Sequence, residues 1–438
     1  MVPRTDAGHT VSAIEGVVLM RNPRCRDGHV RWLLTMGSVA LSLLLPFIVA
    51  PPASAEAHCS SPPEVFPIDD LVPGMTATGL TTISGSTPTS FQVEILGVLP
   101  DYIWLDVDTI VVHLTGPDSF LDQVGGVFYG MSGSPVSKDG KLIGAVSYAV
   151  SEDPTIFGLT PAQAMVDVLT RAPDAAEALP SKIPFDAATR RAVASAIATP
   201  VTEAPSGLQR LPTYLGVSGL SGTMLTRLQR SLDRHGSGMT ATSAGGMRSG
   251  LPVRDTPFAP GEPVGSVLSW GDMTIWAAGT VTLTCDEGLM AYGHSLFYDP
   301  PGELRIGMTG VDVVAVGNGQ GLWADSMIPV LTEPRGTFEQ DRFTGQLGVV
   351  GEQSPSMPIT SEFSSLDTGR SRSGETDAIF QDLWYGDYEV WGHMVLNLGA
   401  VQQEVGPGTV RYGYTIDGTR ADGSAFTVEN RTMAYSDS

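Results

Sequence analysis

Alternating apolar and polar positions run from residue 73 to residue 114 and predict β-strands. In FQVEILGVL, the apolar residues Phe91, Val93 and Ile95 alternate with polar neighbours, which is typical of a strand with one buried face. IWLDVDTIVVHL continues the pattern. Further on, Asp139-Gly140 separates the strand-like runs SPVSK and KLIGAVSYAV, and this dipeptide favours a two-residue β-hairpin turn. The sequence therefore predicts an antiparallel unit rich in hairpins.

Helical patterns follow this unit. GLTPAQAMVDVLTRA predicts a helix with Thr160 as N-cap and Pro161 at the first helical position. Residues 176–262 contain two more helix candidates, FDAATRRAVASAIA and GTMLTRLQRSLDRHG, together with a Gly/Ser-rich stretch. We therefore expect a helical linker region at 176–262.

Strand patterns return at residue 263 and continue nearly to the end of the chain. GSVLSWGDMTIWAAGTVTLTC opens this part, and DYEVWGHMVLNL, TVRYGYTIDGTR and SAFTVENRTMAY predict a late β-meander. A chain of 438 residues is too long for one ordinary core. We expect two β-rich units, at 56–175 and 263–438, on either side of the linker region.

The first 55 residues have the features of an export signal. A group of arginines precedes the uncharged run WLLTMGSVALSLLLPFIVA, and Ala53-Ser54-Ala55 matches a small-residue cleavage site. We expect residues 1–55 to be a signal peptide, and the run is also long enough to serve as an uncleaved membrane anchor. The protein is then secreted or held in the cell envelope, with membrane contact only if this segment stays uncleaved.

The net charge and the cysteines indicate which partners and which compartment are expected. The chain has 25 Lys and Arg against 47 Asp and Glu, a net charge of −22. Such a surface repels phosphate backbones, so nucleic-acid binding is not expected. An oxidising exterior permits a disulfide between Cys59 and Cys285, the two cysteines after the export segment, and two unpaired thiols are the alternative.

The stretch YGMSGSPV places Ser132 in a glycine-rich turn before the hairpin. A serine nucleophile needs a base to accept its proton and preorganised donors for the developing oxyanion. The backbone N–H groups of Gly130 and Ser132 are candidates for this oxyanion hole, since glycine at 130 permits unusual dihedral angles. The alternative is a turn residue with a structural role only.

Histidine is the expected base because its ordinary pKa, near 6.5, suits proton transfer at neutral pH. In GLMAYGHSLFYDP, His294 follows an apolar strand and a glycine, at a strand end where catalytic groups collect. His113 and His393 lie within strand-like runs, where a structural role is expected. His294 is therefore the candidate base.

Together, GMSGSPVSKDGKLIGAV and AYGHS resemble the SpoIVB-type serine peptidases, family 55 of the serine peptidases. The resemblance implies a chymotrypsin-like double β-barrel with Ser132 as nucleophile and His294 as general base. We expect an enzyme that cleaves protein or peptide substrates without a cofactor, and no metal site is expected because no group of His and Cys has the spacing of a zinc site. In that family the histidine motif precedes the serine motif, whereas here it follows by 162 positions. This order implies exchanged barrel halves, which triad geometry tolerates.

The third member of the triad has three candidates. Asp118 lies near the position where the family carries an acid upstream of its serine, and Asp108 and Asp341 are the alternatives. A solvated loop aspartate is the competing interpretation of Asp118. Two further functions stay open at this point: a non-catalytic envelope binding or scaffold protein that retains the peptidase fold, and a protein that cleaves only itself.

Overall fold

The computed structural model of this chain describes residues 14–18, 59–104, 107–169, 182–211, 213–220, 222–234, 239–297, 302–317, 325–379, 386–403, 408–420 and 423–436. The predicted export segment, residues 1–55, lies outside the described residues except for β1 (Ile14–Val18). In the part of the chain that is described, no helix is long and apolar enough to cross a membrane.

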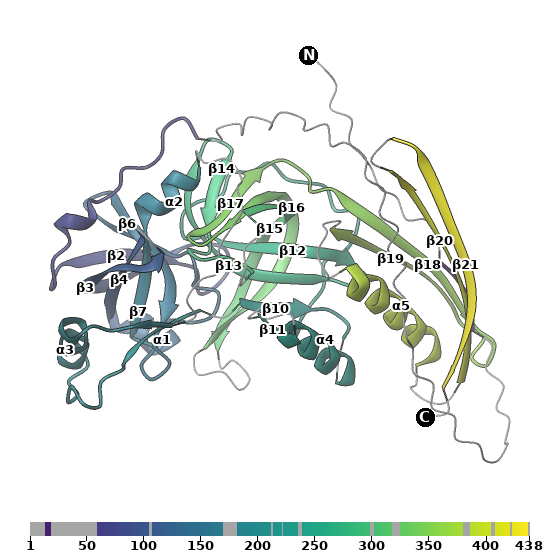
Figure 1. Ribbon diagram of the computed structural model, residues 1–438, viewed down its shortest axis with the longest axis horizontal. Coiled ribbons are helices and arrows are strands. Elements are labelled where there is room, and N and C mark those ends of the chain that lie inside the picture. The colour runs from purple at the N-terminus through teal and green to yellow at the C-terminus, as the bar shows by residue number, and fades with distance from the viewer. Residues whose placement is uncertain are drawn as a thin grey trace, which may run out of the picture.

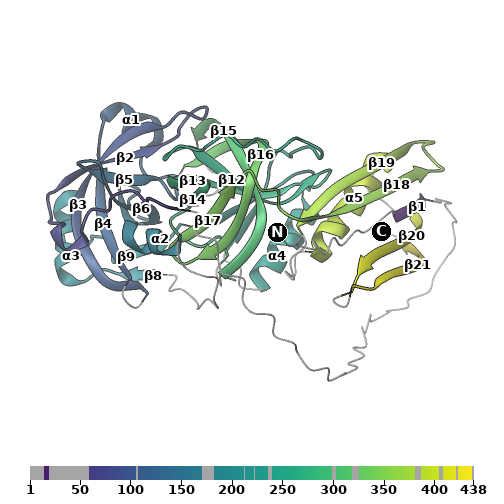
Figure 2. The ribbon, with the colours of Figure 1, turned by 90° about the horizontal axis from the view of Figure 1, so that it is seen from above.

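A closed, six-stranded antiparallel barrel forms the first unit, drawn in purple and blue in Figures 1 and 2. Around the barrel the order is β2 (Thr76–Thr81), β3 (Thr89–Trp104), β4 (Val107–Gly116), β7 (Ile156–Pro161), β6 (Lys141–Ala149) and β5 (Pro135–Lys138). Pairing of β5 with β2 closes it. Two short strands, β8 (Lys182–Pro184) and β9 (Gly207–Arg210), extend the sheet from β6. Alternate strand positions point inward and fill the barrel with apolar side chains.

A second six-stranded antiparallel barrel, green in Figure 1, packs beside the first. Its order is β12 (Pro263–Gly271), β13 (Ile275–Cys285), β14 (Gly288–Ala291), β17 (Gly345–Val350), β16 (Ser326–Arg342) and β15 (Gly302–Gly317). Strand β12 pairs with both β13 and β15, which closes the barrel around a separate apolar core. The predicted double β-barrel is therefore confirmed.

Further strands extend the second sheet at both edges. On one side lie β10 (Thr213–Val217) and β11 (Met239–Ser243). On the other lie β19 (Ser371–Ile379), β18 (Ser356–Ser365), β1, β20 (Gly408–Thr419) and β21 (Ala425–Ser436), which form the far end of the molecule in Figure 1. These strands, β1 among them (labelled in Figure 2), lie at the opposite end from the first barrel.

The helices are η1 (Ile68–Asp70), α1 (Asp118–Val124), α2 (Ala162–Val168), α3 (Ala187–Ala196), α4 (Thr223–Arg234) and α5 (Gly386–Gln402). Helices α3 and α4 are the two predicted in the range 176–262. The hairpin at Asp139-Gly140 is also confirmed, because both residues have positive φ angles, 51° and 80°, between β5 and β6.

Two local predictions are wrong. Thr160 is not an N-cap: it lies in β7, Pro161 is the N-cap of α2, and the Thr160 hydroxyl donates to Gly293 O at 2.6 Å. DYEVWGHMVLNL is not a strand but lies within α5. The buried residues of α5 at four-residue spacing include Glu389, His393 and Asn397, so the helical stripe is largely polar and an apolar pattern does not reveal it.

Candidate active site

Ser132 and His294 meet where the two barrels pack together. Ser132 lies in the turn before β5 of the first barrel, and His294 follows β14 of the second. Ser132 Oγ is 2.9 Å from His294 Nε2, although the residues are 162 positions apart in the chain. The fold thus brings together the two residues that the sequence analysis selected as nucleophile and base.

Strand β13 holds the serine turn by three hydrogen bonds. Thr280 N donates to Ser132 O at 2.8 Å, Thr280 Oγ1 donates to Gly130 O at 2.8 Å, and Thr282 Oγ1 donates to Gly133 O at 2.7 Å. A Cβ at Gly133 would lie 2.0 Å from Thr280 O, and the φ angle of Gly133 is +95°. Glycine is required here by both the backbone conformation and the close approach of β13.

The backbone N–H groups of Gly130 and Ser132, on either side of Met131, are available as hydrogen-bond donors. Within the described residues, neither donates a hydrogen bond to a protein acceptor, whereas Met131 N donates to Phe128 O and Gly133 N donates to Val146 O. Gly130 has a φ angle of +101°. Two unpaired N–H groups beside a serine hydroxyl are the donors that an oxyanion hole uses.

The hydrogen bonds of His294 fix its tautomer. Nδ1 lies 2.8 Å from the main-chain oxygen of Ser295, which can only accept, so Nδ1 carries the proton. Nε2 then has a free lone pair directed at the Ser132 hydroxyl. Burial, followed by the positive charge of Arg210, lowers the pKa of His294 to about 3 and keeps the imidazole neutral. A neutral imidazole with this tautomer is the form that accepts the serine proton.

The backbone before His294 is conformationally unusual. Tyr292 and Gly293 have φ angles of 70° and 65°. For a buried tyrosine this conformation costs about 1–3 kcal/mol and persists only where its surroundings fix it. The fixing contacts come from the first barrel: Thr160 Oγ1 donates to Gly293 O, and a Cβ at Gly293 would lie 2.9 Å from Val146 O. Contacts from the first barrel, which carries Ser132, therefore fix the backbone conformation of Gly293, directly before His294.

Asp341, in β16, holds the turn that follows His294. Its Oδ1 accepts from Leu296 N at 2.7 Å, and its Oδ2 accepts from Phe297 N at 3.0 Å. Burial raises the pKa of Asp341 to about 7, against the opposing effect of these two N–H groups and of the Arg210 charge. Arg210, in β9, donates to Ser295 Oγ at 3.0 Å.

The other two acid candidates lie in different surroundings. Asp118 is exposed in the first turn of α1, and among the described residues no hydrogen bond or ion pair joins it to His294. Asp108 accepts from Asp101 N within the β3–β4 hairpin. Asp341 is thus the candidate that binds residues 295–297, which we call the histidine turn, although among the described residues no hydrogen bond joins it to the imidazole.

Several residues of the site were not selected from the sequence. Thr280 and Thr282 occupy every second position in TVTLTC, and this period is the signal that would have placed both hydroxyls on one face of a strand. Arg210 and Ser295 carry no comparable pattern. Their roles depend on how β9 and the histidine turn meet in space.

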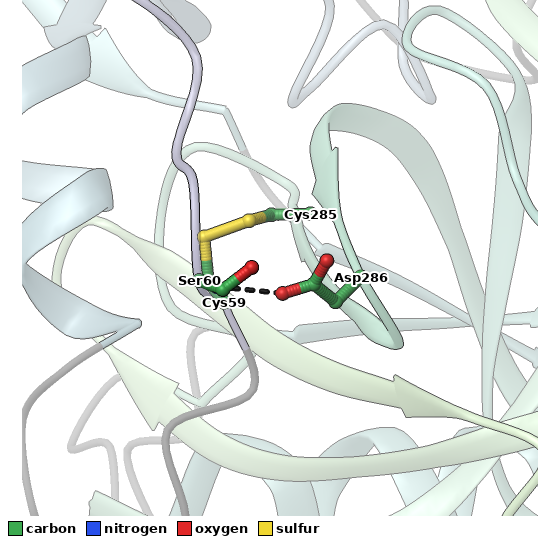
Figure 3. The surroundings of a disulfide bond; sticks show 4 residues. All are labelled: Cys59, Ser60, Cys285 and Asp286. Atoms are coloured by element: carbon green, nitrogen blue, oxygen red, sulfur yellow. Dashed lines mark hydrogen bonds between the residues drawn. A yellow bond between two sulfur atoms is a disulfide. The ribbon is translucent and has the colours of Figure 1, made fainter.

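A disulfide between Cys59 and Cys285 joins the segment that precedes the first barrel to the end of β13 (Figure 3). Beside it, Ser60 N donates to Asp286 Oδ2 at 2.6 Å. A few residues later the chain crosses to the first barrel, where Phe66 N donates to Leu142 O. Residues 59–66, which we call the strap, therefore connect both barrels, and the cysteines are paired.

The start of β16 contacts the segment directly before Ser132. Tyr129 N donates to Asp325 O, and Met327 N donates to Tyr129 O, directly before the glycine of the proposed oxyanion hole. A Cβ at Gly130 would lie 2.8 Å from Met327 Cβ. Ser132 is only 6 % exposed and His294 1 % exposed. The pair is enclosed in this conformation.

No group of three or more His, Cys, Asp or Glu side chains in the described residues is arranged to hold a metal ion.

Comparison with known proteins identifies one family. Residues 56–165 match the family model described as SpoIVB peptidase S55. No curated protein and no solved structure matches the chain. The matched range contains Ser132 and all six strands of the first barrel, and His294 lies beyond it. Residues 56–165 thus match the SpoIVB peptidase family of serine peptidases, the family that the motifs of this chain resemble.

Proposed function

We propose that this protein is an exported serine endopeptidase that cleaves protein substrates through an acyl-enzyme at Ser132. The observation that carries the proposal is the 2.9 Å contact between Ser132 Oγ and the unprotonated Nε2 of His294. The match of residues 56–165 to a serine peptidase family supports the same reaction class.

In the first half of the reaction, Ser132 Oγ attacks the scissile carbonyl carbon while His294 Nε2 accepts the hydroxyl proton. The oxyanion receives hydrogen bonds from the N–H groups of Gly130 and Ser132. When the tetrahedral intermediate collapses, the C–N bond breaks and the amine leaves with the proton from Nε2. A water molecule then attacks the acyl-enzyme with His294 again as base, which releases the carboxylate product and restores the serine.

Export is supported by two independent observations. The first is the pattern of residues 1–55, with its arginines, apolar run and small-residue cleavage site. The second is the Cys59–Cys285 disulfide, because such bonds persist mainly in oxidising compartments. The proposed location is therefore outside the cell or in the cell envelope.

A fluorophosphonate probe, which reacts with activated serines, tests the assignment. We expect the probe to label the wild-type protein and the Ser134→Ala variant, a matched control for the loss of a hydroxyl from the same turn. Labelling should be lost in Ser132→Ala and in His294→Gln. Undiminished labelling of Ser132→Ala would show that another residue is the nucleophile.

The enclosed state of the site favours one alternative, a binding or scaffold protein that keeps the peptidase fold without turnover. In that case neither the wild-type protein nor a variant with a smaller Met327 side chain should react with the probe. A second alternative is a protein that cleaves only itself. In that case the wild-type protein would be shorter than Ser132→Ala by intact mass, and neither protein would cleave added peptides.

A further inference from the structure

The imidazole of His294 is oriented by a peptide group instead of a carboxylate. Nδ1 donates to the carbonyl oxygen of Ser295. In serine peptidases the third group selects the imidazole tautomer, holds the ring and stabilises the imidazolium that forms during the reaction. A neutral carbonyl performs the first two tasks by hydrogen bonding, but it carries only a partial negative charge.

The same peptide group contacts a carboxylate at its other end. The Ser295 carbonyl and the Leu296 N–H belong to one planar unit, and Leu296 N donates to Asp341 Oδ1 at 2.7 Å. Because the C=O and N–H of a trans peptide point in opposite directions, holding the N–H toward Asp341 directs the carbonyl toward His294. Phe297 N, bound to Asp341 Oδ2, prevents the turn from rotating.

Hydrogen bonds arranged in a chain also polarise one another. An ionised acceptor at the N–H end draws the N–H hydrogen toward itself and shifts electron density onto the carbonyl oxygen. The Ser295 carbonyl then becomes a stronger acceptor for the Nδ1 proton. We propose that Asp341 acts as a positioning residue for His294 through the Ser295–Leu296 peptide group, taking over the orienting task of a triad acid without touching the imidazole.

Arg210 completes the arrangement from the serine-bearing barrel. Its Nη1 donates to Ser295 Oγ at 3.0 Å and to Phe297 O at 3.4 Å, and β9 is paired to β6. The histidine turn is thus held by an acid from its own barrel and by a base from the other barrel. The positive charge of Arg210 disfavours the imidazolium of His294 and favours the ionised form of Asp341.

This inference rests on the proposed function for its catalytic meaning, but the orientation of His294 is measurable without turnover. The experiment is a long-range ¹⁵N–¹H spectrum of the mature protein labelled with ¹⁵N-histidine, with His294 assigned from the His294→Gln variant. It is recorded for the wild type, Asp341→Asn and the control Asp312→Asn, which makes the same change at an exposed position of β15. Labelling rates with the fluorophosphonate probe are measured on the same samples.

We expect His294 in the wild type to be protonated at Nδ1, with that proton strongly deshielded by its hydrogen bond. In Asp341→Asn the Nδ1 proton should move upfield and the labelling rate should fall about ten- to a hundredfold, the range for loss of a charged hydrogen bond. Asp312→Asn should match the wild type in both measurements. A protein that lacks peptidase chemistry would show the expected spectra but no labelling, which separates failure of the proposed function from failure of this inference.

Two results would overturn the inference. One is protonation of His294 at Nε2 in the wild type. The other is a folded Asp341→Asn variant with the His294 signals and labelling rate of the wild type.

A pH titration of the wild type provides a test that needs no variant. The charged and titratable groups that interact with Asp341 are Arg210 from β9, Arg342 from β16 and Tyr292 from the segment after β14. His294 is linked to Asp341 through the Ser295–Leu296 peptide group. Of these groups, Asp341 is the one expected to titrate near pH 7. The Leu296 amide and the His294 Nδ1 proton should therefore shift together in this range, and independent behaviour would contradict the inference.

Discussion

Loss of the Cys59–Cys285 disulfide should lower the stability of the protein by a predictable amount. The bond closes a loop between residues separated by 226 positions. In the chain-entropy description, a loop of this length restricts the unfolded chain enough to contribute about 5 kcal/mol to folding. For roughly 380 residues after the export segment, the entropy of unfolding is about 0.8 kcal/mol/K, so the midpoint should fall by about 6 °C.

The measurement is the unfolding midpoint of the mature wild type and of the Cys59→Ala/Cys285→Ala double variant, followed by circular dichroism with and without a phosphine reductant. Reductant should lower the midpoint of the wild type toward that of the double variant and leave the double variant unchanged. Labelling of Ser132 at 25 °C should persist, because the backbone hydrogen bonds from the strap to Leu142 remain. A double variant as stable as the oxidised wild type would refute the view that the strap restrains the two barrels.

Further predictions concern the site itself. Thr280→Val removes the hydroxyl that donates to Gly130 O and should slow labelling about two- to tenfold, measured as the second-order rate constant. Met327→Ala opens the space beside Gly130 and should speed labelling, whereas an unchanged rate would show that this side chain does not limit access. Asp118→Asn should label at the wild-type rate, because Asp118 is exposed and no hydrogen bond or ion pair among the described residues joins it to His294; a large loss would restore it as the triad acid. The pKa of His294 is lowered by folding, so the unfolded chain binds its proton first as the pH falls below about 6.5. Between pH 6.5 and pH 3, His294 therefore lowers the free energy of unfolding by up to about 1.4 kcal/mol for each pH unit. In chemical denaturation over this range, the free energy of unfolding of His294→Gln should fall less steeply with pH than that of the wild type.

The sequence predicted the elements whose local pattern determines their structure. The alternation of Phe91, Val93 and Ile95 in β3 and the Asp139-Gly140 turn depend on neighbouring residues alone, and both appear where they were expected. The serine turn was recognisable because glycine at 130 and 133 is required by the backbone itself. His294 was found by its position at the end of an apolar strand.

The remaining features depend on contacts between distant segments. Asp341 is one acid among 47 acidic residues, and nothing near it in the sequence shows that it binds the turn after His294. Helix α5 was mistaken for a strand because its buried face carries His393, bound to Ser361 and Thr376, instead of an apolar stripe. Asp118 was selected by resemblance to the family, and the position of α1 leaves it exposed.

In the proposed function, Ser132 and His294 form one proton-transfer pair beside an oxyanion hole. A crystal structure of the mature protein after reaction with a phosphonate inhibitor tests it most directly. We expect phosphorus to be bonded to Ser132 Oγ, with a phosphoryl oxygen within hydrogen-bond distance of the Gly130 and Ser132 N–H groups. His294 Nε2 should lie beside Ser132 Oγ. An adduct on a different residue, or a phosphoryl oxygen pointing away from both N–H groups, would contradict it.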